Sequence, residues 1–92
     1  MRRVYVVISG DVQGVGFRSW IKKRAQNLRI TGWVGNRADG VVEAVFEGEA
    51  DKITEMIELC YSGPDVAWVK DVQVTGQVYT DEFMDFEVKI ED

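Results

Sequence analysis

Hydrophobic and polar positions alternate along several short segments of this chain, and in two longer segments the apolar positions recur every three or four residues. The alternation predicts strands over 3–9, 31–37, 41–47 and 66–75. A short fifth strand is predicted from Phe86, Val88 and Ile90. The helical spacing predicts two amphipathic helices, one with its apolar positions at Phe17, Trp20, Ile21, Ala25 and Leu28, the other at Ile53, Met56, Ile57 and Cys60.

Turn residues separate these segments. Ala38-Asp39-Gly40 predicts a tight hairpin between the second and third strands, and Gly63-Pro64 ends the second helix. The order is therefore strand, helix, strand, strand, helix, strand, with a terminal strand added. We expect an α+β fold: a ferredoxin-like split βαβ sandwich with both helices on one face of a mostly antiparallel four- to five-stranded sheet.

The other face of that sheet is expected to meet water. Strand alternation places six side chains on it: Glu43, Val45, Glu47, Asp71, Gln73 and Thr75. An acidic face with Tyr5 as its expected aromatic is a poor platform for nucleic acid, so RNA binding ranks far behind other functions.

Composition limits the chemistry. The 92 residues fit a single domain over 1–92, with 46% hydrophobic residues and one proline. No segment resembles a signal peptide or a membrane span, and Cys60 cannot pair within the chain, so we expect a cytoplasmic protein without a membrane partner. Histidine is absent and no metal-ligand spacing occurs, so metal-free chemistry is expected.

Charge is distributed unevenly along the chain. Up to Arg37 there are eight basic residues and one acid, a balance of +7, whereas the remainder has three basic and fifteen acidic residues, a balance of −12. The total is −5. A local positive field for a small anion fits this asymmetry. Simple solvation of the first helix and its exit is preferred for four of the basic residues, Lys22, Lys23, Arg24 and Arg29.

The segment 10–18 joins the first strand to the first helix through three glycines and ends on Arg18. Glycines let the backbone approach a ligand, and the free N–H groups at a helix start attract anions. Arg18 adds a planar cationic fork that matches a phosphate. A structural turn with a surface arginine is the alternative, but the arginine falls in the first helical turn, where it and the loop amides can converge on one anion.

Two longer motifs resemble a known family. Residues 12–18 (VQGVGFR), followed by 31–36 (TGWVGN) and 39–43 (DGVVE), resemble the two signatures of the acylphosphatases, and Gly48 and 62–64 (SGP) fit the same pattern. The resemblance covers nearly the whole chain. It implies the ferredoxin-like fold and hydrolysis of the carboxyl-phosphate bond of acyl phosphates, with no metal or organic cofactor.

The resemblance also implies site residues. Arg18 would bind the phosphate and Asn36 would position the attacking water, while the loop amides that could donate to the phosphate belong to Gln13, Gly14, Val15, Gly16 and Phe17. Asn36 could instead cap a turn, although the hairpin apex lies three residues later. Asp11 and Gly35 stand where the family commonly has more basic residues, so weaker phosphate affinity is expected.

Other functions and roles stay open at this point. A non-catalytic ferredoxin-like module that binds a small phosphorylated ligand or a protein partner is the alternative function. Packing is favoured over substrate stacking for Trp20, Trp33 and Phe46, and an inert buried thiol over a nucleophile for Cys60. We expect a monomer, although Phe83 and Met84 could either cover the core or meet a partner.

Overall fold

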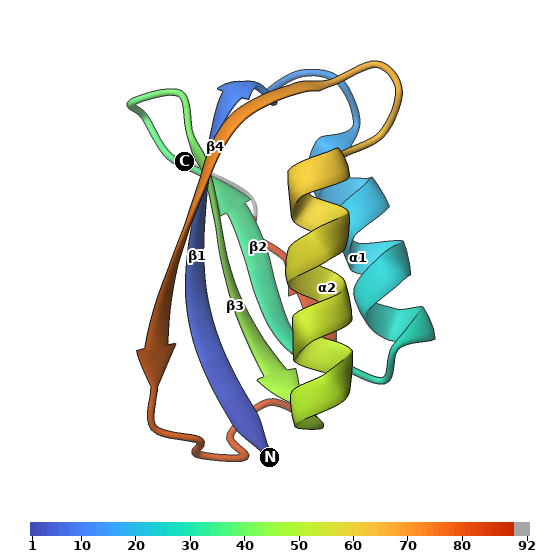
Figure 1. The fold of residues 1–92 in the computed structure, drawn as a ribbon, viewed down its shortest axis with the longest axis vertical. Coiled ribbons are helices and arrows are strands. Elements are labelled where there is room, and N and C mark those ends of the chain that lie inside the picture. Colours follow the sequence, from blue (N-terminus) through green and yellow to red (C-terminus); the bar gives the residue numbers. More distant parts are fainter. Residues whose placement is uncertain (90–92) are drawn as a thin grey trace.

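The computed structural model describes residues 1–89. Its five strands and two helices follow the predicted order (Figure 1). The elements are β1 (Arg2–Asp11), α1 (Phe17–Asn27), β2 (Thr31–Asn36), β3 (Val42–Gly48), α2 (Ala50–Ser62), β4 (Trp68–Gln77) and β5 (Phe86–Val88). Ile90, predicted to extend the fifth strand, lies outside the described residues.

The strands form one sheet in the order β4-β1-β3-β2-β5. Every pairing is antiparallel except that of β5, which runs parallel to β2. Both helices cover the same face of this sheet, as Figure 1 shows. The predicted ferredoxin-like α+β sandwich is therefore confirmed. α1 begins, and β2 ends, at the same end of the sheet, because the two elements run in opposite directions along it (Figure 1).

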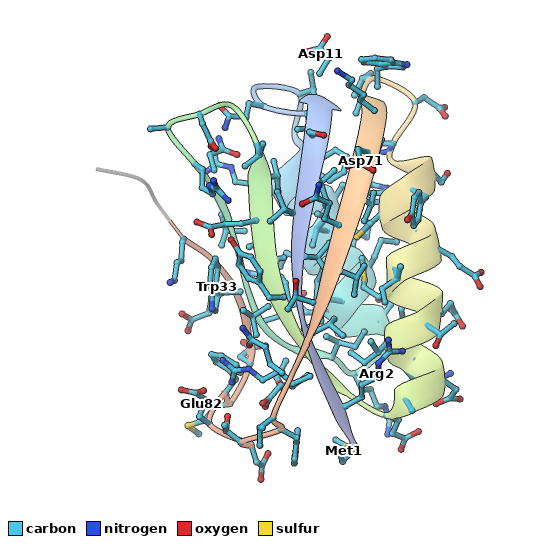
Figure 2. The ribbon with its side chains drawn as sticks, turned by 60° about the vertical axis from the view of Figure 1, so that its left-hand side comes forward. Met1, Arg2, Asp11, Trp33, Asp71 and Glu82 are labelled. Carbon is cyan, nitrogen blue, oxygen red and sulfur yellow. The ribbon has the colours of Figure 1, made fainter. Side chains whose placement is uncertain are left out.

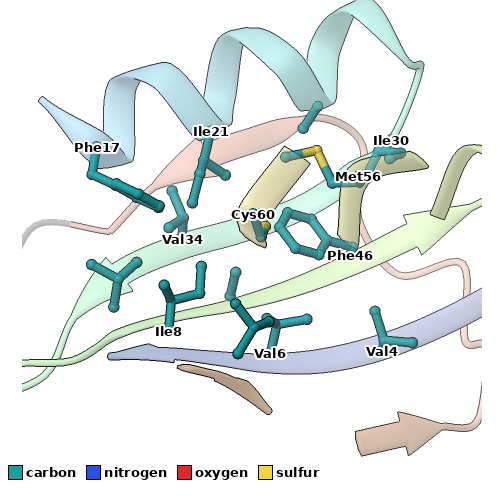
Figure 3. Packing of buried hydrophobic residues seen from close by; sticks show 14 of the residues in the cluster. Val4, Val6, Ile8, Phe17, Ile21, Ile30, Val34, Phe46, Met56 and Cys60 are labelled. Carbon is teal, nitrogen blue, oxygen red and sulfur yellow. The ribbon is translucent and has the colours of Figure 1, made fainter. Parts of the chain in front are cut away.

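The core lies between the helices and the sheet (Figure 3). Its α1 stripe consists of Phe17, Ile21 and Ala25, all at most 1% exposed, and its β1 stripe of Val4, Val6 and Ile8. Phe46 of β3 stacks on Phe86 of β5 with ring centroids 5.6 Å apart. Burial of these apolar side chains supplies the main driving force for folding. Burial also fixes α1 and β2 relative to each other. The loop before α1 and the last residue of β2 are thereby held at the same end of the sheet.

The face opposite the helices is less open than predicted. Val45 and Glu47 were expected to meet water, but they are only 3% and 1% exposed. For Glu47 the cause is the strap, residues 78–85, which connects β4 to β5. The backbone N–H and the hydroxyl of Thr80 donate to Glu47 Oε2 over 2.9 and 3.1 Å, and Arg3 Nη1 donates to the same oxygen over 3.2 Å. A charge predicted to be solvated is thus held in a clasp of hydrogen bonds.

Arg3 is the centre of that clasp. It donates to Glu82 Oε1 over 2.5 Å and lies over the ring of Phe83 at 5.2 Å. Hydrogen bonding from Arg3 lowers the pKa of Glu82 below the ordinary value of 4.5. Of the two strap residues that the sequence left open between core and partner, Phe83 is half-buried, whereas Met84 is fully exposed.

Trp33 lies on the same face, on the side of the sheet away from the helices, as does Glu82 (Figure 2). Sequence spacing suggested core packing for this tryptophan, but its side chain is half-exposed and Lys89 Nζ sits 3.7 Å from the ring centroid. Tyr5 is therefore not the sole outward aromatic. Phe46 is a core residue as predicted, and Trp20 packs against the core while partly exposed.

Candidate active site

The loop between β1 and α1 turns through two left-handed glycines. Gly14 and Gly16 both have φ of +76°, a conformation that costs a residue with a side chain about 1–2 kcal/mol. A Cβ built on either glycine meets no atom within 4 Å. The glycines are therefore required by the backbone conformation, and the space beside them stays accessible.

The start of α1 presents backbone donors to that space. Gly16, the N-cap residue, has no side chain to cap the helix, and its carbonyl accepts the first helical bond from Trp20 N–H over 3.1 Å. The N–H groups of Phe17, Arg18 and Ser19 precede the first residue that can donate within the helix. No acidic residue occupies this turn. The positive end of the helix is therefore uncompensated and suited to an anion.

A hollow of about 270 Å³ lies at this helix start. It is lined by Val12, Gly14, Gly16, Phe17, Arg18, Ser19 and Val88. Three of the predicted phosphate-binding residues besides Arg18 thus contribute to one concave surface. Val12, Ser19 and Val88 are additions that sequence reasoning missed. Val12 and Ser19 directly flank the predicted phosphate-binding residues 13–18, but Val88 reaches the hollow through the pairing of β5 with β2, for which the sequence has no local signal.

Arg18 lies in the first turn of α1 with its side chain half-exposed. Its Nη1 donates to the carbonyl of Lys89 over 3.4 Å, a long hydrogen bond. A guanidinium has five N–H donors, and this contact engages one of them. The interaction holds the side chain beside the C-terminal end of β5 while other donors can serve an anion.

Asn36 is the last residue of β2. It pairs in register with Val42, whose side chain is fully buried in the core, so Asn36 shares the helix-covered face of the sheet. Its Oδ1 atom is buried and accepts no hydrogen bond from the described residues. Buried polar atoms without partners are rare and require an explanation, a catalytic role among them.

The position of Asn36 relative to the hollow follows from strand geometry. Val34 pairs with Val88, which lines the hollow, and Asn36 follows Val34 by two residues on the same face. Two strand residues span about 7 Å. Asn36 therefore lies close to the hollow, at the end of the sheet where α1 begins, although it is not one of the lining residues. The alternative role as a turn cap finds no support in the hydrogen bonds of the described residues.

Gln13 and Val15 differ from the expectation for loop residues around an anion. Neither lines the hollow. The side chain of Val15 packs against the core, and the side chain of Gln13 reaches the β2–β3 hairpin, where Nε2 donates to the carbonyls of Arg37 and Val41. Their backbone N–H groups stay predicted donors, but their side chains serve other purposes.

Other chemistry can be assessed from the described residues. Burial raises the pKa of the Cys60 thiol to about 12, and the side chain is fully buried, in accord with the predicted inert thiol. Among residues 1–89 no cluster of three or more histidine, cysteine or acidic side chains could hold a metal ion. In the same part of the chain, neither helix has the length and apolarity needed to cross a bilayer.

Comparison with known proteins gives a consistent result. The family model for acylphosphatase matches residues 4–88. An acylphosphatase of Pelotomaculum thermopropionicum is 48% identical over 86 residues, which cover 94% of each chain. The crystal structure of acylphosphatase from Bacillus subtilis superposes with a TM-score of 0.94 at 31% identity, covering 98% of this chain and 100% of the other. An acylphosphatase structure from Coxiella burnetii reaches 0.91 at 41% identity, covering 96% and 92%.

Proposed function

This chain belongs to the acylphosphatase family and functions as a hydrolase of acyl phosphates, and on that premise we propose how its residues divide the reaction. Arg18 and the backbone N–H groups around the start of α1 bind the phosphoryl group. Asn36 holds the attacking water. The observation that carries the proposal is the uncapped start of α1, which opens into a hollow beside the Arg18 guanidinium.

The chemistry of the substrate suits so few groups. An acyl phosphate is a mixed anhydride whose leaving group is a carboxylate, with a conjugate-acid pKa of about 4. Such a group departs without strong protonation. Phosphoryl transfer passes through a loose transition state with charge on the equatorial oxygens, so positioning and electrostatic stabilisation supply most of the catalysis. Arg18 and the helix-start amides provide both.

Asn36 contributes orientation rather than basicity. A carboxamide is not basic enough to remove a proton, but its oxygen can accept a hydrogen bond from a water molecule and direct that water at phosphorus. The buried Oδ1 is an acceptor with no donor among the described residues, which supports this role. The proton released by the attacking water passes to an oxygen of the phosphoryl group itself.

We also propose that residues 1–92 act as one metal-free, cofactor-free monomeric domain in the cytoplasm, with no nucleic-acid partner. The residues assigned to the reaction all come from one chain. The sheet face away from the helices has acidic side chains, among them the buried Glu47, and acidic groups repel the phosphates of a nucleic acid. The alternative of a non-catalytic binding module is not favoured, because the relatives that match are named acylphosphatases.

Steady-state hydrolysis of benzoyl phosphate tests these assignments. Arg18→Ala should lower kcat/KM by about 10³-fold, because a charge-assisted contact to the transition state is lost. Lys23→Ala, which removes an exposed charge from the same helix, is the matched control and should retain activity. Activity should persist with a chelator. Full activity in Arg18→Ala, or loss of activity with the chelator, contradicts the proposal.

A further inference from the structure

Gln13 connects the phosphate loop to the hairpin that follows Asn36. Its Nε2 donates to the carbonyl oxygen of Arg37 over 2.8 Å and to that of Val41 over 3.0 Å. These two carbonyls lie at the base of the β2–β3 hairpin, where Arg37 N–H also donates to Val41 O over 2.9 Å. One side chain thus bridges two segments that are 24 residues apart in the sequence.

The bridge restrains direction as well as distance. A carboxamide nitrogen has two N–H groups in a fixed plane, and each of the two finds its own carbonyl acceptor. The contacts are partly buried, so water competes with them less than at an open surface. The first carbonyl belongs to the residue directly after Asn36. Movement of the loop relative to Asn36 therefore requires both hydrogen bonds to stretch.

We propose that Gln13 is a positioning residue, whose side chain fixes the phosphate loop at the distance from Asn36 that places the water in line with phosphorus. This inference rests on the roles proposed above for Arg18 and Asn36. The two halves of the site come from different segments: the loop and α1 hold the phosphoryl group, and β2 holds the water. The Gln13 side chain joins these two segments by hydrogen bonds.

Phosphate binding and kcat should respond differently to the loss of the Gln13 hydrogen bonds. The phosphoryl group is held by Arg18 and amides on one continuous segment, so its binding does not require a fixed distance between that segment and β2. The water depends on the other segment. Loss of the bridge should therefore lower kcat while phosphate binding persists, whereas a side chain that only stabilises the fold would lower thermal stability and leave kcat unchanged.

Gln13→Met removes both donors while keeping the length of the side chain, and Gln73→Met, the same change at an exposed position of β4, is its control. We expect kcat for benzoyl phosphate to fall about 10-fold to 100-fold, as small misplacements of reacting groups do. Competitive inhibition by inorganic phosphate should change less than about threefold, a difference of under 1 kcal/mol. An unchanged kcat, or an equal loss of kcat and of phosphate affinity, overturns the inference.

A second variant covers poor folding of the first. Gln13→Glu keeps the shape, but its carboxylate cannot donate, so kcat should be low at neutral pH. Protonation of the carboxyl restores one donor. We expect kcat of Gln13→Glu, relative to the wild type at each pH, to rise as the pH falls toward the carboxyl pKa, about 4.3 when unperturbed. A ratio that does not change with pH overturns the inference.

A double-mutant cycle with Asn36→Ala completes the test, measured on residual hydrolysis at high enzyme concentration. If Gln13 acts through Asn36, adding Gln13→Met to Asn36→Ala should change kcat less than about twofold. Effects that multiply overturn the inference, even though each residue alone matters. If Asn36→Ala alone leaves kcat unchanged, it is the proposed role of Asn36 that fails, and the Gln13 assignment falls with it.

Discussion

Asn36 is predicted to lower the stability of the fold while raising kcat. Replacing it with an apolar residue should therefore raise Tm and lower kcat. Its Oδ1 is buried without a donor among the described residues. A buried acceptor left unpaired costs about 1–3 kcal/mol. Asn36→Val removes that acceptor and places a β-branched side chain opposite Val42, a fully buried core residue. We therefore expect the variant to be about 1–2 kcal/mol more stable than the wild type.

In a domain of this size each kcal/mol corresponds to about 4–8 °C in Tm, so the midpoint should rise by about 5–15 °C. The same substitution removes the group that holds the water, and kcat should fall about 10²-fold to 10³-fold, the range seen for single preorganised hydrogen-bonding groups. Thermal unfolding followed by circular dichroism and steady-state hydrolysis of benzoyl phosphate measure the two quantities on one preparation.

Thr31→Val on the same strand is the control, because it adds a similar side chain on the opposite face and away from the site. It should leave kcat unchanged and alter Tm by only a few degrees. A fall in Tm for Asn36→Val means that Oδ1 is already satisfied in the free protein, and the energetic reasoning is then wrong. If Tm rises but activity is unchanged, Oδ1 of Asn36 does lack a partner in the free protein, but its catalytic role is refuted.

Backbone strain, an ion pair and a surface charge each have a measurable effect. Gly32→Ala should destabilise the fold by about 3–5 kcal/mol in urea unfolding, because φ is +136° and an added Cβ would overlap the backbone of β3; a loss below 1 kcal/mol contradicts this. Arg3 lowers the pKa of Glu82, so the stabilisation is present above about pH 4.5 and is lost as the pH falls through the lowered value. The Tm difference between wild type and Glu82→Gln should therefore shrink on acidification; a constant difference argues against the clasp. Asp11→Asn, which removes an exposed charge near the loop, should strengthen phosphate inhibition less than about threefold and only at low salt.

Local periodicity was sufficient to predict the elements, because an amphipathic helix or strand records its buried face in the sequence. The stripe of Phe17, Ile21 and Ala25 predicted α1, and all three side chains are buried in the core. Boundaries that depend on pairing were less accurate. The fourth strand was predicted over 66–75 but occupies Trp68–Gln77, where its pairing with β1, including the irregularity after Ser9, sets its ends.

Contacts between distant segments could not be predicted in the same way. The burial of Glu47 depends on a strap more than 30 residues further along the chain. The parallel docking of β5 on β2 brings Lys89 beside both Trp33 and Arg18, and nothing in the alternation of three residues specifies it. The charge and hydrophobic periodicity of a segment predict which of its side chains are buried within that segment's own element. Which distant residues those side chains contact depends on how the elements are arranged in the fold.

The candidate site shows the same division. The placement of the loop glycines beside Arg18 was predictable, because these residues lie within seven consecutive positions. The reach of the Gln13 side chain to a hairpin carbonyl was not, since it depends on how β1, β2 and β3 pair. The unpartnered oxygen of Asn36 is likewise a property of the packed structure alone.

Several departures from ordinary folding rules lie together at the end of the sheet where α1 begins, although others, such as the unpartnered Oε1 of Glu47 among the described residues, lie at the opposite end. The two helices differ at their starts: Asp51 lies in the first turn of α2, where its charge offsets the helix dipole, whereas the first turn of α1 has no acid. Two left-handed glycines and a buried Asn36 oxygen, which has no partner within residues 1–89, lie at the same end as the uncompensated start of α1. Each feature alone reduces stability, and each is explained if an anion and a water molecule interact there. Natural sequences tolerate such conflicts mainly where function requires them, so their coincidence is independent physical support for an anion site at the start of α1.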